Sequence, residues 1–109
     1  MKLENKTTTI EIPVQGTNEL KALTYADLIS MLMNTPKQGG YSIEDIENRT
    51  DIKKELKKAD ESNEEIISFE NANGTYLKNI VKASDFRFPF VHEDLKEFFD
   101  VIKELKAEK

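Results

Sequence analysis

The chain contains a single histidine, His92, which is followed by the acids Glu93 and Asp94. An imidazole beside carboxylates, with Lys96 one turn further on, has the residue types of a general acid–base cluster. No serine or second histidine is spaced to complete a nucleophilic triad. Acids are also favoured at the start of a helix, where the dipole is positive. We therefore interpret these residues as a helix start, and we expect no catalytic residue and no enzymatic activity.

Carboxylates are plentiful and could in principle bind magnesium or serve a hydrolase. The densest group comprises Glu44, Asp45, Glu47 and Asp51. Such spacing is more typical of a solvated helical face. The absence of cysteine excludes thiolate metal sites, a disulfide framework and a cysteine nucleophile. We expect neither a metal nor a cofactor.

A glycine pair precedes a predicted helix start at Ser42, within the segment Gln38, Gly39, Gly40 and Tyr41. Glycines before a helix N-terminus occur in loops that bind phosphate. This segment lacks the GK[ST] ending of a Walker loop, so we interpret it as a turn.

Two short helices are predicted in the middle of the chain. The first covers residues 43–48, and the second begins at residue 50 or 51 and runs to Ala59. Joined at residues 49–51, the pair resembles a helix-turn-helix in outline.

Basic residues on this helix pair support a second function. Arg49, Lys53 and Lys57 would supply contacts to the phosphates of DNA. Acids interleaved on the same helices would repel that backbone. A winged-helix-like DNA-binding regulator is therefore the alternative function.

The remaining pattern predicts strands at two places. Alternation over residues 8–14 indicates a strand with one buried face, which either is an edge strand or ends at Pro13. After a turn, the chain is expected to return as a strand at residues 19–23. A short β-prone run at residues 66–69 is expected to pair with this hairpin. The aromatic segment 86–91, which includes Phe88, is expected to lie extended across the core.

Three further helices are expected from apolar spacing and capping residues. The first follows the N-cap Thr24 and ends near Asn34, and the others begin near Asn71 and Glu93. Together these elements predict an α+β fold, with a small antiparallel sheet of two to three strands and about four helices.

Length and composition favour one domain over residues 1–109, with 1–6 and 106–109 frayed. The net charge of −5 opposes nonspecific attraction to nucleic acid and anionic membranes. No signal peptide or membrane-spanning run is visible, so we expect no membrane association and a location in the cytoplasm of a host cell or in a virion.

Several segments resemble a small phage-encoded family. They are the run from Tyr25 to Ile29, the run from Asn34 to Ile46 with its Pro-x-Gln-Gly-Gly turn, Leu56 to Ala59, and Leu77 with Lys78. The resemblance covers roughly residues 10 to 105. It implies a phage or prophage origin and assigns no activity to any residue.

A noncatalytic protein-binding module is therefore the leading functional hypothesis: a virion accessory, an assembly factor or a modulator of a host protein. The partner would be another protein or a second copy of this chain, with nucleic acid second. Aromatic residues that reach the surface would form the contact patch. The candidate interaction surface comprises Gln38, Gly39, Gly40, Tyr41, Arg49, Lys53, Lys57 and Phe88.

Overall fold

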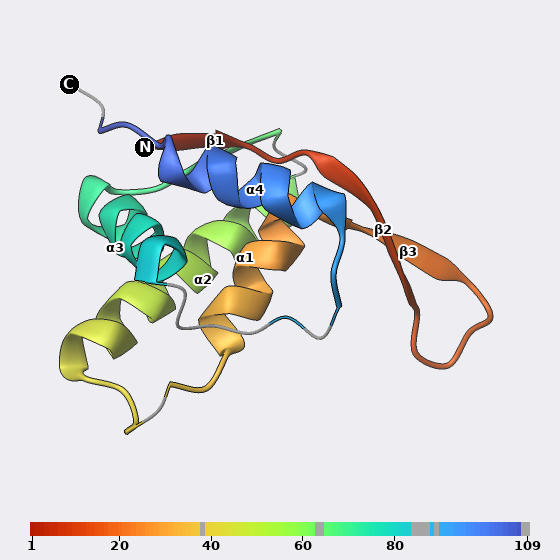
Figure 1. Cartoon of the computed structure of the whole chain (residues 1–109), viewed down its shortest axis with the longest axis horizontal. Helices are drawn as coiled ribbons and strands as arrows, with labels where there is room; N and C mark the ends of the chain where they lie inside the picture. Colours follow the sequence, from red (N-terminus) through yellow and green to blue (C-terminus); the bar gives the residue numbers. More distant parts are fainter. Residues whose placement is uncertain (38, 63–64, 84–87, 89, 108–109) are drawn as a thin grey trace.

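The computed structural model describes residues 1–37, 39–62, 65–83, 88 and 90–107. Within these residues the chain forms four helices and two antiparallel strand pairs (Figure 1), which confirms the predicted α+β fold. The element order is β1 (Lys2–Glu4), β2 (Thr7–Pro13), β3 (Leu20–Thr24), α1 (Tyr25–Asn34), α2 (Ile43–Ser62), β4 (Ile66–Ser68), α3 (Asn71–Ala83) and α4 (Glu93–Lys103).

The predicted hairpin is present as β2 and β3 and projects from the helical body (Figure 1). Its strand β2 ends at Pro13, as expected for a residue that cannot donate to the ladder. The turn contains Gly16 at a φ of 81°, a conformation that favours glycine. Ile10 is buried but Ile12 is 39% exposed, because the distal half of the hairpin extends beyond the helices.

The first residues of the chain form a strand, so the expectation that residues 1–6 are frayed is wrong. β1 pairs antiparallel with β4, which therefore does not pair with the hairpin as predicted. The Met1 ammonium donates to the Phe69 carbonyl at 2.6 Å, and the Phe69 N–H donates back to the Met1 carbonyl at 2.7 Å. A three-residue strand shows too little alternation to be recognised in a sequence.

The helix α1 begins as predicted after Thr24. The Thr24 hydroxyl accepts from the Asp27 N–H at 3.2 Å, and the Asp27 carboxylate accepts from the Thr24 N–H at 2.9 Å. This reciprocal capping box satisfies two backbone donors that the first turn would leave unpaired.

The central helix α2 is continuous from Ile43 to Ser62, so the predicted helix-turn-helix-like pair is wrong. The start at Ser42 was predicted correctly, since the Ser42 hydroxyl accepts from the Asp45 N–H at 3.0 Å. No proline or glycine interrupts the helix. Residues 49–51 are polar and therefore indicate a break in the helix. In the structure, however, Arg49 lies on the inward side of a continuous helix and forms hydrogen bonds there.

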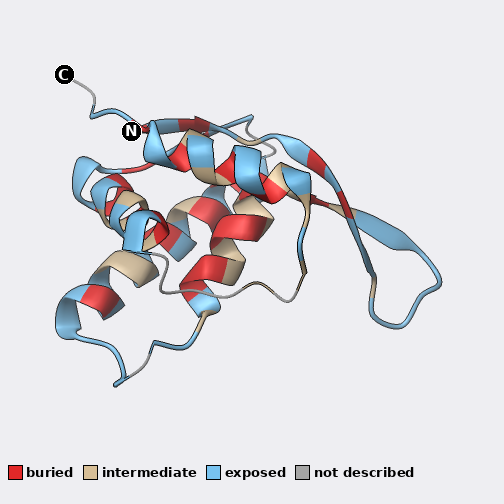
Figure 2. Cartoon of the chain, viewed as in Figure 1, coloured by how far each residue is buried: buried red, intermediate tan, exposed pale blue. Residues whose placement is uncertain are grey.

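The core lies where the helices face one another and the strands (Figure 2). The largest fully buried side chains are Phe98, Leu3, Leu28, Ile29, Leu32, Ile52, Ile67, Leu77 and Ile102. Burial of each such side chain contributes about 1.5–3 kcal/mol. None of the helices in the described part of the chain is both long and apolar enough to cross a membrane.

One glycine of α3, Gly74, is packed against the Met1 side chain. A Cβ added to Gly74 would overlap the Met1 Sδ and lie 2.9 Å from its Cγ. A new rotamer of Met1 would not relieve the whole contact, because the Met1 Cβ lies 3.2 Å from the added carbon and two hydrogen bonds to Phe69 hold the Met1 backbone. The glycine therefore permits a close approach between α3 and the start of the chain.

We predict that Gly74→Ala lowers the free energy of unfolding by about 1–3 kcal/mol through overpacking. The expected sign is opposite to that in most helix interiors, where alanine is the better residue. Urea denaturation measures the change. Thr75→Ala, at the exposed neighbouring position, is the control and should change stability by less than about 0.5 kcal/mol. A stabilised Gly74→Ala protein would contradict the packing argument.

Candidate functional site

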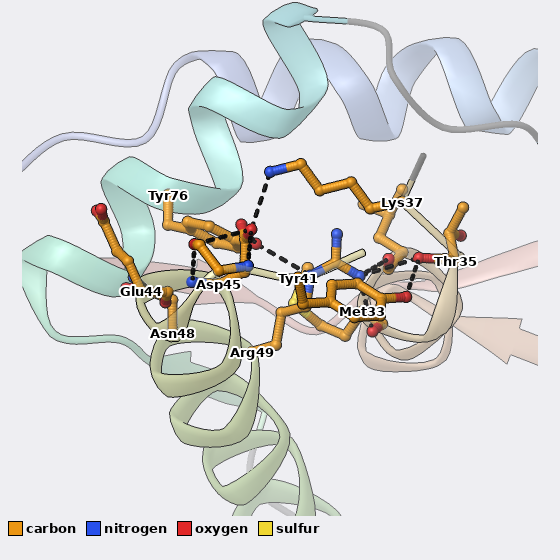
Figure 3. Close-up of polar contacts among 11 residues, drawn as sticks. Met33, Thr35, Lys37, Tyr41, Glu44, Asp45, Asn48, Arg49 and Tyr76 are labelled. Atoms are coloured by element: carbon orange, nitrogen blue, oxygen red, sulfur yellow. Dashed lines mark hydrogen bonds and ion pairs between the residues drawn. The ribbon is translucent and has the colours of Figure 1, made fainter. Parts of the chain in front are cut away.

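The Arg49 side chain ends at the last carbonyls of α1 (Figure 3). Its Nη1 atom donates to the carbonyls of Leu32 at 3.4 Å, Met33 at 3.0 Å and Thr35 at 3.1 Å. The last carbonyls of a helix lack their usual intrahelical donors, and the negative end of the dipole favours a cation there. Arg49 therefore caps α1 from a neighbouring helix.

A hydrogen-bond relay links Arg49 to a buried carboxylate on the same helix. Arg49 Nε donates to Tyr76 Oη at 3.0 Å, and Tyr76 Oη donates to Asp45 Oδ1 at 2.7 Å. Asp45 Oδ2 accepts from Lys37 Nζ at 2.9 Å, from the Ser42 N–H at 2.9 Å and from the Ser42 hydroxyl at 3.0 Å. Asp45 is only 5% exposed, so these donors replace its hydration.

These contacts determine which groups carry charge. The Lys37 ammonium, the Ser42 N–H and the Tyr76 hydroxyl hold the pKa of Asp45 well below its usual range, against the opposing effect of burial. The hydrogen bond to Asp45 raises the pKa of Lys37. Burial raises the pKa of Tyr76, so its hydroxyl remains a donor near neutral pH. The cluster therefore holds two cations and one anion.

Two hollows lie beside this cluster, and Arg49 lines both. The first has a volume of about 220 Å³ and lies among α1, α2 and α3. The second has a volume of about 250 Å³ and is more open, with Tyr41, Ile46 and Lys53 among its lining residues.

Apolar side chains are exposed beside the second hollow, on the first turn of α2 and just before it. Ile43 is 78% exposed, Ile46 55% and Tyr41 43%. Ile43 and Ile46 are three residues apart and so share one helical face, while Tyr41 and Ile46 line the same hollow. We call these three residues the apolar patch.

The structure describes Gly39, Gly40 and Tyr41 of the turn predicted before α2. Gly39 and Gly40 are exposed and have φ values of 85° and 88°, as a turn built on glycine requires. Tyr41 follows with its ring 4.8 Å from the Arg49 guanidinium, and its hydroxyl donates to the Thr35 carbonyl at 2.9 Å. Gln38 lies outside the described residues.

The other predicted surface residues separate into different environments. Arg49 is half-buried, and it donates to the α1 carbonyls while lining both hollows. Lys53 is exposed at the second hollow, whereas Lys57 is exposed and lies 4.0 Å from Glu61. Phe88 is half-buried, with its ring 5.7 Å from that of Phe99. Of the predicted surface residues that the structure describes, Tyr41, Arg49 and Lys53 line the same hollow.

The remaining residues of the aromatic segment are described only in part. Phe90 is half-buried against the core and lies 6.1 Å from Phe88. Phe86, Arg87 and Pro89 fall outside the described residues. The expected extended path of this segment is therefore not described as a whole.

The interpretation of His92 as part of a helix start is confirmed, since it is the N-cap of α4. Its Nδ1 atom accepts from the Asp94 N–H at 3.0 Å and so cannot also donate to the Asp94 carboxylate. That carboxylate accepts from the N–H and hydroxyl of Thr9, both at 2.8 Å, which lowers its pKa. The group therefore ties α4 to β2.

In residues 1–37, 39–62, 65–83, 88 and 90–107, no three His, Asp or Glu side chains are grouped closely enough to hold a metal ion. Comparisons with protein-family models, with curated proteins and with solved structures found no match to this chain. The apolar patch and the two hollows are therefore the surface features from which we infer a function.

We predict that Tyr76→Phe lowers the free energy of unfolding by about 1–3 kcal/mol, because it leaves Arg49 Nε and Asp45 Oδ1 without their shared partner. Chemical denaturation at neutral pH measures the loss. Tyr41→Phe removes an exposed hydroxyl with a single hydrogen bond and is the matched control, with an expected loss below about 1 kcal/mol. Equal effects of the two substitutions would refute the relay.

A second prediction concerns pH. Because the pKa of Asp45 is lowered by folding, its ionised form stabilises the protein above the ordinary aspartate pKa of about 3.9, and this contribution declines as pH falls below that value. Asp45→Asn should be about 1–3 kcal/mol less stable than the parent chain at pH 7. The difference should shrink as pH falls from about 4 to about 3, as measured by urea denaturation.

Asp51→Asn provides the control for the loss of one negative charge from an exposed position on α2. It should match the parent chain in stability at pH 7. A stability gap between Asp45→Asn and the parent chain that stays constant down to pH 3 would contradict the assigned role of the Asp45 charge.

Proposed function

We propose that the chain is a noncatalytic protein-binding module that docks its partner on the apolar patch. The observation that carries this proposal is the exposure of Ile43 and Ile46 one turn apart beside Tyr41. Large aliphatic side chains grouped on a surface lose contact with water when a partner covers them. The adjoining 250 Å³ hollow offers a recess for a side chain of that partner.

The charges around the patch favour a partner with a basic rim. Glu44 and Glu47 are exposed on the same two turns of α2 as the patch isoleucines, and the whole chain carries a net charge of −5. Complementary charge at the rim speeds encounter and selects the partner, while the apolar centre supplies most of the affinity. We infer a protein partner with an apolar centre surrounded by lysine or arginine.

The biological setting in this proposal comes from the resemblance to a phage-encoded family. A module of this kind would act as a virion accessory, an assembly factor or a modulator of a host protein, in the host cytoplasm or the virion.

DNA reading is not retained as a second candidate. Its premise was a pair of short helices, and the structure has one continuous helix instead. Arg49 is half-buried and its Nη1 atom donates to the carbonyls of α1, so its side chain does not project from the helix as a contact to a DNA backbone requires. DNA binding remains a possible outcome of the test below.

The test is quantitative affinity capture from a candidate host lysate, followed by a binary binding measurement with each purified protein that is retained. We predict that Ile43→Asp combined with Ile46→Asp weakens binding at least about tenfold, because it places two charges in an apolar interface. The fold should persist, since both residues are exposed in the free chain. Light scattering at rising concentration tests self-association with the same variants.

Val91→Asp is the matched control, because Val91 is fully exposed on a segment that does not contribute to the patch. It should bind like the parent chain. A partner that binds the double variant and the parent chain equally would contradict the proposal. So would tight binding of duplex DNA that is lost when Lys53 and Lys57 are replaced by glutamate.

A further inference from the structure

The 220 Å³ hollow on the other side of Arg49 has the composition of a small ligand site. Leu32, Ile80 and Ala83 contribute apolar wall, while Lys37, Arg49 and Tyr76 contribute polar groups. Sites for drug-sized ligands usually measure roughly 300–1,000 Å³. This hollow therefore suits one small group or one side chain.

The charges at this hollow do not cancel. Lys37 and Arg49 are cations and Asp45 is an anion, so the three groups sum to one positive charge. Asp45 is paired directly with Lys37 at 2.9 Å and reaches Arg49 only through the Tyr76 hydroxyl. Among the described residues no carboxylate lies within ion-pair distance of Arg49. Only the carbonyl end of α1, with its partial negative charge, offsets the second cation, so the hollow favours an anion over a cation.

Donors are also available for such an anion. The Arg49 Nη2 atom forms no hydrogen bond to a described residue, because the four bonds of this side chain come from Nε and Nη1. Figure 3 shows this nitrogen pointing away from the α1 carbonyls, on the side where the Lys37 side chain runs. Lys37 Nζ donates to Asp45 and has further donors, since an ammonium carries three.

We propose that this hollow binds a single carboxylate on a short apolar stem. The carboxylate accepts from Arg49 Nη2 and Lys37 Nζ, and the stem packs on Leu32, Ile80 and Ala83. A dianion such as phosphate suits the site less well, because the Asp45 carboxylate shares Lys37 and would repel a second full charge. This site is separate from the apolar patch, so it stands independently of the proposed function.

Two kinds of ligand carry one carboxylate on a short apolar stem. They are a free small carboxylic acid and the C-terminal residue of a peptide. Butyrate represents the first. A short peptide that ends in leucine represents the second, compared with its amidated form. Both sources place one carboxylate beside a few apolar carbons.

The experiment is an NMR titration of the intact chain with butyrate, followed on the Arg49 Nε–H signal and on the backbone amides of Leu32 and Ile80. We expect saturable shifts, and at least about tenfold weaker binding of butyramide, which has the same shape without the charge. Lys37→Gln should weaken butyrate binding about tenfold. Lys54→Gln, at an exposed position on α2 outside the hollow, should not change it.

A second variant tests the location without altering a charge. Ala83 is exposed at the wall of the hollow, and Ala83→Phe should fill the space and abolish butyrate binding while the chain stays folded. The double aspartate variant of the apolar patch should bind butyrate like the parent chain. Tighter binding of the free-acid peptide than of butyrate identifies a peptide terminus as the source, and the reverse order identifies a small acid.

Three results would overturn the proposal. They are the absence of saturable shifts with both butyrate and the free-acid peptide, equal binding of butyrate and butyramide, and preferential binding of inorganic phosphate at the same residues. None of these results bears on partner capture by the apolar patch.

Discussion

Arg49 reaches from the second turn of α2 to the carbonyl end of α1, and the placement of the central helices depends on it. A half-buried guanidinium requires several acceptors in fixed directions, because unpaired donors away from water are costly. The α1 carbonyls and the Tyr76 hydroxyl meet that requirement, and Tyr76 belongs to α3. One side chain therefore fixes three helices, with Asp45 completing the same network.

This constraint also determines what α2 exposes. Asp45, Arg49, Ile52, Leu56 and Ala59 recur at three or four residues and form the inward stripe of the helix. Ile43 and Ile46 lie off this stripe and must face solvent. Over its first two turns, α2 therefore turns the polar residues Asp45 and Arg49 inward and exposes the apolar residues Ile43 and Ile46. The isoleucines are exposed because the polar residues occupy the inward stripe.

This exchange of the usual polar and apolar faces in α2 explains which elements could be predicted from the sequence and which could not. The hairpin, α1 and α4 were predictable because their apolar periodicity agrees with their burial and because Thr24 and Pro13 mark clear boundaries. In α2 the periodicity is broken by Arg49, so a continuous helix was interpreted as two. Extending the stripe back from Ile52 by helical spacing would have placed Arg49 and Asp45 inside.

The candidate site was predictable only in part for the same reason. Tyr41 could be proposed from the sequence because aromatic residues are enriched in interfaces and this one lies in a predicted turn. Lys37 and Tyr76 were missed as site residues, because only tertiary structure brings them to Asp45 across eight and 31 positions of the chain. Ile43 and Ile46 could not be placed on the surface from the sequence, because apolar residues three apart on a helix are equally typical of a buried face.

The pairing of β1 with β4 has a consequence for the order in which the molecule can assemble during synthesis. Lys2 lies opposite Ser68, so β1 has no partner until the residues that separate these two positions have been made. At roughly 5–20 residues per second the ribosome needs several seconds to reach that point. The local hairpin and α1 are complete long before then. β1 therefore joins the fold after the hairpin and α1 have formed, while α3 and α4 are still to be made.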